Sequence, residues 1–508
     1  MTFAWVVILP VAVMLSLVGS RFTIHWQSVF TITHVVGLLF VIMYKADTPD
    51  LYPHNAHYKI GWIATGLVPA QMVIGLAEHM AASLRRRSLR RAHLASAEER
   101  CYFIPDGEYR ISSESCHNIE SNTDALPSSW DTTLQAREQD LDKECDSSNP
   151  QLSRSKLSLY RMRISRQLAV TVTWLVSSRT WWCFDLLYRI TDRIILPFGF
   201  AVVTTGIATF GRFFEGHAIF SGLAHWIKGG VFFWLGLFTL GRWCGSFAEL
   251  GWAWNARPRA RRTKWYPSIE FVESALIFLY GSTNIFLEHL GRWGGDWTAQ
   301  DLQHLAITIL FIGGGLCGML VESAFIRRLL NMTASQVSVV PIHDESVHEE
   351  RQQPDTYQFS LNPIPALVIL MVGVIMSSHH QSSHISTTVH KQWGNLLLGA
   401  SFARTLTYIL IYLRPPKSTL PSRPPTELLA AFGLIAGGII FMASSSDTIQ
   451  AIIDHDLDAM FIYTITMGLV ALLMAWEVLV LASKGWAAHC ERRLIPSQSP
   501  VNHLQGSP

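Results

Sequence analysis

Long apolar blocks alternate with short polar segments along most of this chain. With their flanks, most of these blocks approach the ~20 residues that a helix needs to cross a bilayer. Because backbone groups in hydrocarbon must bond to one another, such blocks predict membrane-spanning helices. We count about eleven: Phe3–Val18, Val29–Met43, Ile60–Leu76, Ile194–Phe210, Gly230–Leu240, Phe271–Phe286, Leu305–Leu320, Ile364–Met376, Leu396–Leu413, Leu428–Met442 and Ala459–Leu481.

Composition supports this interpretation. Hydrophobic residues make up 49% of the 508 residues and charged residues only 15%, whereas soluble domains have about 25% charged residues. The formal net charge of +2 gives no reason to expect nucleic acid as a partner. The sequence therefore predicts an all-α, polytopic transmembrane helical bundle whose constant partners are membrane lipids.

The distribution of Lys and Arg predicts the orientation. Basic clusters such as residues 85–91 and 257–262 follow odd-numbered blocks, and cytosolic loops carry the excess of Lys and Arg. We therefore expect the N-terminus outside and the C-terminus in the cytosol. No basic segment precedes Phe3–Val18 and Pro10 interrupts it, so we interpret it as the first span and not as a cleavable signal peptide. This pattern favours the secretory pathway or plasma membrane.

Polar segments divide the chain into regions. We expect a three-helix membrane unit at residues 1–82, a disordered cytosolic linker at 83–160, and spans four to seven within 161–330. A polar cytosolic loop at 331–360, spans eight to eleven within 361–486, and a short cytosolic tail at 487–508 follow. The linker is rich in Ser, Glu, Asp and Arg and lacks helical periodicity, which is typical of disorder.

Histidines concentrate near the predicted outer ends of the spans. His380 and His384 are four residues apart and would share one helix face. Imidazole is the commonest metal ligand near neutral pH, and Zn or Cu sites need three or four converging donors. The alternative to a metal site is that these histidines bind no ligand and lie at span ends because imidazole tolerates the lipid headgroup region. The predicted Zn or Cu site comprises His379, His380, His384, His390, His289 and His304.

One histidine and three charged residues inside the predicted spans bear on function. His34 lies near the middle of the second span, where it either forms a hydrogen bond between helices or ligates haem iron. Arg404 lies in the ninth span, with Glu477 and Glu273 at similar depth in other spans. A lone charge at this depth costs roughly 2.5–3.5 kcal/mol. We expect Arg404 to pair with one of these carboxylates, Glu477 in preference, as a structural ion pair.

Several motifs resemble the fungal Ytp-one-like family of membrane proteins. In the N-terminal part they are the segments at residues 4–10, 34–37, 48–53 and 57–62. In the C-terminal part they are Gly222-Leu223-Ala224-His225-Trp226-Ile227-Lys228-Gly229, Val389-His390-Lys391-Gln392-Trp393-Gly394-Asn395 and Pro421-Ser422-Arg423-Pro424-Pro425-Thr426-Glu427. The resemblance covers nearly the whole chain apart from the polar loops. It implies a fungal membrane protein but no defined chemistry.

The N-terminal unit is also similar to transmembrane cytochromes of the b-561 type, through Leu9-Pro10, Ser20-Arg21, His34 and His57-x-x-x-Gly61. Those four-helix bundles hold haem between pairs of histidines and pass electrons across the membrane. The resemblance implies haem b ligated by His34 and His57. Spans one and four have no histidine, and His225 in span five could substitute.

Three functions therefore remain open. One is transmembrane electron transfer through His-ligated haem, with an unknown redox partner. The second is a metal-binding transporter or sensor that uses the outer histidine cluster. The third is a structural scaffold without a cofactor. No hydrolase, nucleotide-binding or metalloprotease motif is present.

Overall fold

The computed structural model describes residues 1–48, 52, 55–77, 80, 179–215, 219–258, 266–288, 295–335, 359–378, 381 and 383–493. Within these ranges the protein is helical and contains no strand. This confirms the predicted all-α class. The predicted linker, as well as His289, His379 and His380, lies outside the described residues.

Every predicted apolar block lies in a helix. Among the described residues, eight helices are long and apolar enough to cross a membrane by length and composition, and Ala4–Val18 and Ile364–Ser378 are shorter apolar helices. The count of eleven spans and their orientation stay predictions. The helices are η1 (Ala4–Ile8), α1 (Leu9–Val18), α2 (Thr23–Asp47), Ala56–Ala77, α7 (Arg179–Phe210), α8 (Ile219–Cys244), η3 (Ala248–Leu250), α9 (Ile269–Glu288), α10 (Ala299–Glu322), α11 (Ala324–Ser335), α13 (Ile364–Ser378), α14 (His384–Leu413), α15 (Pro425–Ala443), α16 (Ser446–Asp454) and α17 (Ala459–Arg493).

Two helices extend into segments that we expected to be polar loop or tail. Helix α17 continues to Arg493, past the expected boundary at residue 486. Helix α11 runs through Ser335, past the expected start of the polar loop at residue 331.

Local sequence signals set the ends of other helices. Gly19 ends α1 with a left-handed backbone (φ 65°), as is common at helix C-termini. Thr298 and Asp301 form a capping box at the start of α10, which bonds two otherwise unpaired backbone N–H groups.

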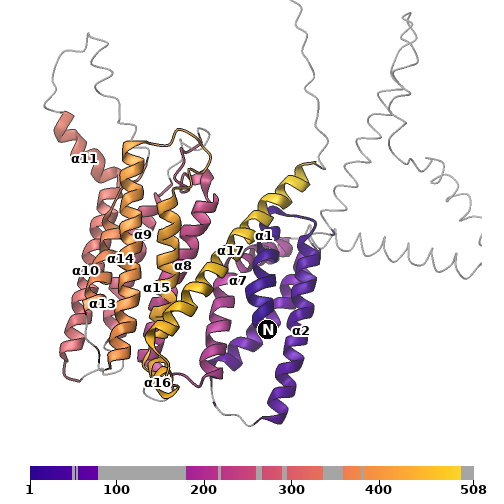
Figure 1. Ribbon diagram of the computed structural model, residues 1–508. Helices are drawn as coiled ribbons and strands as arrows, with labels where there is room; N and C mark the ends of the chain where they lie inside the picture. Colours follow the sequence, from indigo (N-terminus) through magenta and orange to yellow (C-terminus); the bar gives the residue numbers. More distant parts are fainter. Residues whose placement is uncertain are drawn as a thin grey trace, which may run out of the picture. The chain divides into compact units, whose positions relative to one another are not determined.

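The chain divides into two compact units, one of residues 1–64 and 196–508 and the other of residues 65–195. In the first unit, six helices run alongside one another, namely α8, α9, α10, α13, α14 and α15 (Figure 1). The main packing pairs are α8 with α15, α15 with α14, α14 with α13, and α9 with α10. Helix α17 leans across α8 and α15 (Figure 1). In the second unit, Gln71 donates a hydrogen bond to the buried Asp192 at 3.3 Å.

Small residues allow α8 and α15 to pack with their backbones in close approach. A methyl group on Gly438 would lie 2.6 Å from the carbonyl oxygen of Gly229 and 2.5 Å from the backbone nitrogen of Phe233. A methyl group on Gly229 would lie 2.6 Å from the carbonyl oxygen of Gly438. Close backbone contact through small residues is how helices associate where surrounding lipid removes the hydrophobic driving force.

The N-terminal helices pack against the C-terminal one. Helix α1 contacts both α2 and α17, and Leu15 packs with Val480 and Ala487 in a buried cluster. The indole nitrogen of Trp476 donates a hydrogen bond to the Val6 carbonyl at 3.2 Å. Segments more than 450 residues apart in sequence therefore share one core.

Candidate cofactor cavity

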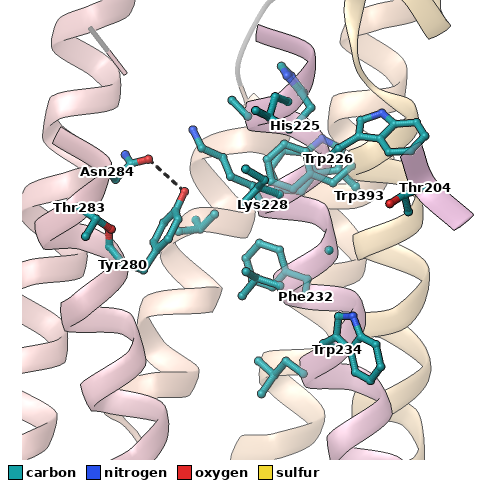
Figure 2. Close-up of a pocket in the computed structure, with 18 of the residues that line it drawn as sticks. Thr204, His225, Trp226, Lys228, Phe232, Trp234, Tyr280, Thr283, Asn284 and Trp393 are labelled. Atoms are coloured by element: carbon teal, nitrogen blue, oxygen red, sulfur yellow. Dashed lines mark hydrogen bonds between the residues drawn. The ribbon is translucent and has the colours of Figure 1, made fainter. Parts of the chain in front are cut away.

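A cavity of 2630 Å³ lies inside the first unit, with α8 on one side and α9 and α10 on the other. Helices α13 and α14 contribute further wall residues. Its lining is mostly apolar and aromatic, with few polar groups, which is the usual composition of a ligand site in a helical bundle. Figure 2 shows Trp226, Phe232, Trp234 and Trp393 among the lining side chains.

Two of the predicted site histidines meet on the cavity wall. The rings of His225 on α8 and His390 on α14 have centroids 6.1 Å apart and an interplanar angle of 88°. Nδ1 of His390 lies 2.8 Å from the carbonyl oxygen of Ser386. Because a carbonyl can only accept, this Nδ1 carries the proton and Nε2 carries the lone pair. Histidines that bind metal usually have this arrangement, with one ring N–H bonded to a fixed acceptor.

One helical turn after His225, Lys228 also lines the cavity. In Figure 2 its side chain extends from α8 toward the side on which Tyr280 and Asn284 of α9 lie. Tyr280 donates to Asn284 Oδ1 at 3.1 Å, and Asn284 donates to Thr308 Oγ1 of α10 at 2.9 Å. On this side the cavity thus combines aromatic walls with a lysine and a hydrogen-bonded polar group. A lysine within an apolar span is costly and by default indicates function.

The other predicted histidine ligands differ in where they lie relative to the cavity. His57 and His304 line the cavity, whereas His384 is exposed at the start of α14. His57 Nδ1 lies 3.1 Å from the Thr205 hydroxyl, whose own proton is directed to the Ala201 carbonyl at 2.7 Å. Among the described residues, no three His, Cys, Asp or Glu side chains converge as metal ligands would.

His34 is buried in the first unit, with 2% of its surface exposed. The indole N–H of Trp5 donates to His34 Nδ1 at 3.3 Å, so the neutral ring carries its proton on Nε2. A haem-ligating histidine presents a lone pair to iron and donates its other N–H to an acceptor. The hydrogen bond of His34 has the opposite direction and joins η1 to α2. The role of His34 as a haem ligand stays a prediction.

Arg404 has partners other than the preferred Glu477. Its Nε lies 2.7 Å from Glu427 Oε1 of α15, and its Nη1 lies 3.4 Å from Glu273 Oε1 of α9. Nη2 donates to the Thr239 hydroxyl of α8 at 3.1 Å. The preferred pair is corrected because α15 lies next to α14 and places Glu427 directly beside Arg404. Glu273, the other carboxylate considered, is a partner as expected.

Sequence reasoning missed Glu427 and Arg242. Glu427 follows a proline-rich stretch and looked like part of a loop, yet it is fully buried in the first turn of α15. Arg242 looked like a basic residue after a span, but it is 2% exposed and its guanidinium stacks 4.1 Å from the Trp254 ring centroid. The signal that could have found Lys228 was its place two residues before the apolar block Gly230–Leu240 and three residues after His225.

At another part of the cavity lining, Tyr52 contacts the segment after α7. Its hydroxyl donates to the carbonyl of Phe213 at 3.0 Å, and the backbone N–H of Phe214 donates to Asp447 at 2.5 Å. Burial, followed by the nearby carboxylates of Glu215 and Asp447, raises the pKa of Tyr52. The tyrosine therefore stays a neutral hydrogen-bond donor at physiological pH.

The chain is similar to known fungal proteins over most of its length. The C-terminal family model for proteins like YTP1 matches residues 198–485, and a domain of unknown function, DUF2427, matches residues 1–81. An uncharacterized membrane protein of Schizosaccharomyces pombe is 35% identical over 96% of this chain and 93% of its own length.

Two relatives come from Saccharomyces cerevisiae. An uncharacterized membrane protein is 41% identical over 59% of this chain and 48% of its own length. Protein YTP1 is 26% identical over 35% of this chain and 31% of its own length. No solved structure matches. The chain is an integral, multi-pass membrane protein and belongs to the fungal YTP1-like family.

Proposed function

We propose that the cavity holds one b-type haem and that the protein is a membrane electron carrier. The observation that carries this proposal is the pair of His225 and His390, contributed by two different helices to one cavity wall, with ring centroids 6.1 Å apart. An imidazole nitrogen coordinates a metal at about 2.0–2.1 Å, so two histidines that would hold one ion must lie this close together. The iron would be held by these two side chains.

The number of histidines favours haem over Zn or Cu. A Zn site takes three or four donors from the protein, whereas the porphyrin supplies four nitrogens to haem iron and leaves one or two positions for side chains. Only pairs of such donors occur among the described residues. A bare metal ion also has no need for a cavity of 2630 Å³.

The rest of the lining fits the chemistry of haem. Porphyrin is a broad aromatic plate, and Trp226, Phe232 and Trp393 offer aromatic surface beside the two histidines. Haem also carries carboxylate side chains, and Lys228 offers a positive charge one helical turn from His225. This proposal keeps His225, the expected substitute ligand, and places His390 in the role that the sequence assigned to His34 and His57.

Each group has a definite task in this proposal. His225 and His390 hold the iron, Lys228 orients the cofactor through a carboxylate, and the aromatic walls exclude water. When bound, haem supplies one-electron transfer, and ligand identity and burial set its potential. The electron donor and acceptor are membrane or soluble redox partners.

The test is a dithionite-reduced minus oxidised visible spectrum of the purified full-length protein, expressed with sufficient haem. We expect the sharp α-band of a six-coordinate b-type haem. His225→Ala and His390→Ala should each abolish it or convert it to a high-spin spectrum, and Lys228→Gln should lower haem occupancy several-fold.

Two controls make this test specific. His455→Ala removes an exposed histidine that forms the same Nδ1 contact with a carbonyl, Ala451, at 2.8 Å, and it should leave the band unchanged. His34→Ala should also retain the band if the protein folds. A flat spectrum from folded wild-type protein would refute haem binding, and loss of the band in His34→Ala alone would return the site to α2.

A further inference from the structure

A second polar site lies at the opposite end of the six-helix bundle from His225 and His390. Arg242 is near the end of α8, Glu270 and Glu273 are near the start of α9, Arg404 is in the last third of α14, and Glu427 is near the start of α15. All five side chains are at most 8% exposed. We call these residues the charge cluster.

The contacts of the charge cluster join four helices. Glu273 is shared, with Oε1 3.4 Å from Arg404 Nη1 and 3.7 Å from Arg242 Nη1. Arg404 also bonds Glu427, and Arg242 Nε donates to the Trp252 carbonyl at 2.7 Å. Arg242, Glu273, Arg404 and Glu427 are therefore one connected network and not a set of separate pairs. Glu270, one helical turn before Glu273, is buried within electrostatic reach of Arg242 and Glu273.

The charges in this network do not balance. Three carboxylates face two guanidinium groups among the described residues. A net charge in a water-poor interior is costly, and a buried acid avoids the cost by binding a proton. From α10, Glu322 is bonded by Ser268, Ser360 and Arg327, and α13 has no titratable side chain.

The two guanidinium groups are bonded unequally to the carboxylates. Both oxygens of Glu427, a fully buried residue, lie within 2.9 Å of Arg404 Nε. Nη1 of Arg242 has no hydrogen bond of acceptable geometry among the described residues and lies 3.7 Å from Glu273 Oε1. The carboxylates on the Arg242 side are therefore the less fully compensated ones.

We propose that the charge cluster is a proton-binding site that holds one exchangeable proton and communicates with the cavity through Glu273. Of its three carboxylates, Glu273 lines the cavity, and the same group bridges both guanidiniums. A charge that binds in the cavity therefore changes the electrostatic potential at the Glu273 carboxylate. Uptake or release of the proton then offsets that charge. This inference does not depend on the identity of the cavity ligand.

The test is infrared spectroscopy of the full-length protein in lipid, in H₂O and D₂O, across mildly acidic to mildly alkaline pH. We expect a protonated-carboxyl C=O band at neutral pH that shifts in D₂O. Glu270→Gln and Glu273→Gln should each lower the intensity of this band by the contribution of one carboxyl group. In each variant the two remaining carboxylates balance the two guanidiniums, so no proton is bound.

Three further variants keep the result decisive. Arg242→Gln leaves three carboxylates facing one guanidinium and should increase the cluster's band about twofold through binding of a second proton. Glu477→Gln and a variant of Asp192 identify bands from buried acids outside the cluster. If folded Glu270→Gln and Glu273→Gln retain the full band, the cluster holds no proton and the inference is wrong. A flat visible spectrum would leave this infrared result unaffected.

Discussion

Replacing Arg404 with methionine is expected to lower the free energy of unfolding by roughly 3–5 kcal/mol, the usual cost of removing one partner from a buried ion pair. The change leaves Glu427, which is fully buried, and Glu273 without their main cation. The measurement is the thermal unfolding midpoint of the detergent-purified protein, followed by tryptophan fluorescence and size-exclusion chromatography.

A matched variant distinguishes this network from the pairing that the sequence favoured. Glu477→Gln should change the midpoint little, because one oxygen of Glu477 has no hydrogen-bond partner among the described residues and Arg404 bonds other carboxylates. The double variant Arg404→Met with Glu427→Met should recover part of the loss, since both charges leave together. Equal destabilisation by Glu477→Gln and Arg404→Met would instead indicate the Arg404–Glu477 pair.

Gly438→Val is expected to have the second large effect, because it places a branched side chain against the backbone of α8. The first added carbon would lie 2.5 Å from the Phe233 nitrogen and 2.6 Å from the Gly229 oxygen, and neither atom can move without displacing the helix. Overpacking of this kind costs about 1–3 kcal/mol or more. The check is the unfolding midpoint, together with the yield of monodisperse protein after purification.

The same substitution at Gly468 of α17 is the control. Nothing lies within 4 Å of a methyl group built there, and valine has a better helix propensity than glycine. Gly468→Val should therefore be neutral or slightly stabilising. If both substitutions have the same effect, helix propensity and not the α8–α15 contact governs stability at Gly438.

The sequence alone determined the helical class and the positions of the helices. Each apolar block, such as Leu428–Met442, became part of a helix such as α15, because the need to satisfy backbone groups in hydrocarbon is a local property of the chain. It also identified Arg404 as a buried charge that needs a carboxylate, since the cost of isolating that charge depends on depth alone.

Only the tertiary structure decided which side chains meet. Hydropathy gives the depth of a residue in its span but neither the neighbouring helix nor the face turned toward it. Glu477 and Glu427 were therefore not distinguishable as partners of Arg404 until α15 was placed beside α14. In the same way, α8 and α14 both pack against α15, which brought His225 beside His390, and the packing of η1 and α2 placed the Trp5 indole against His34.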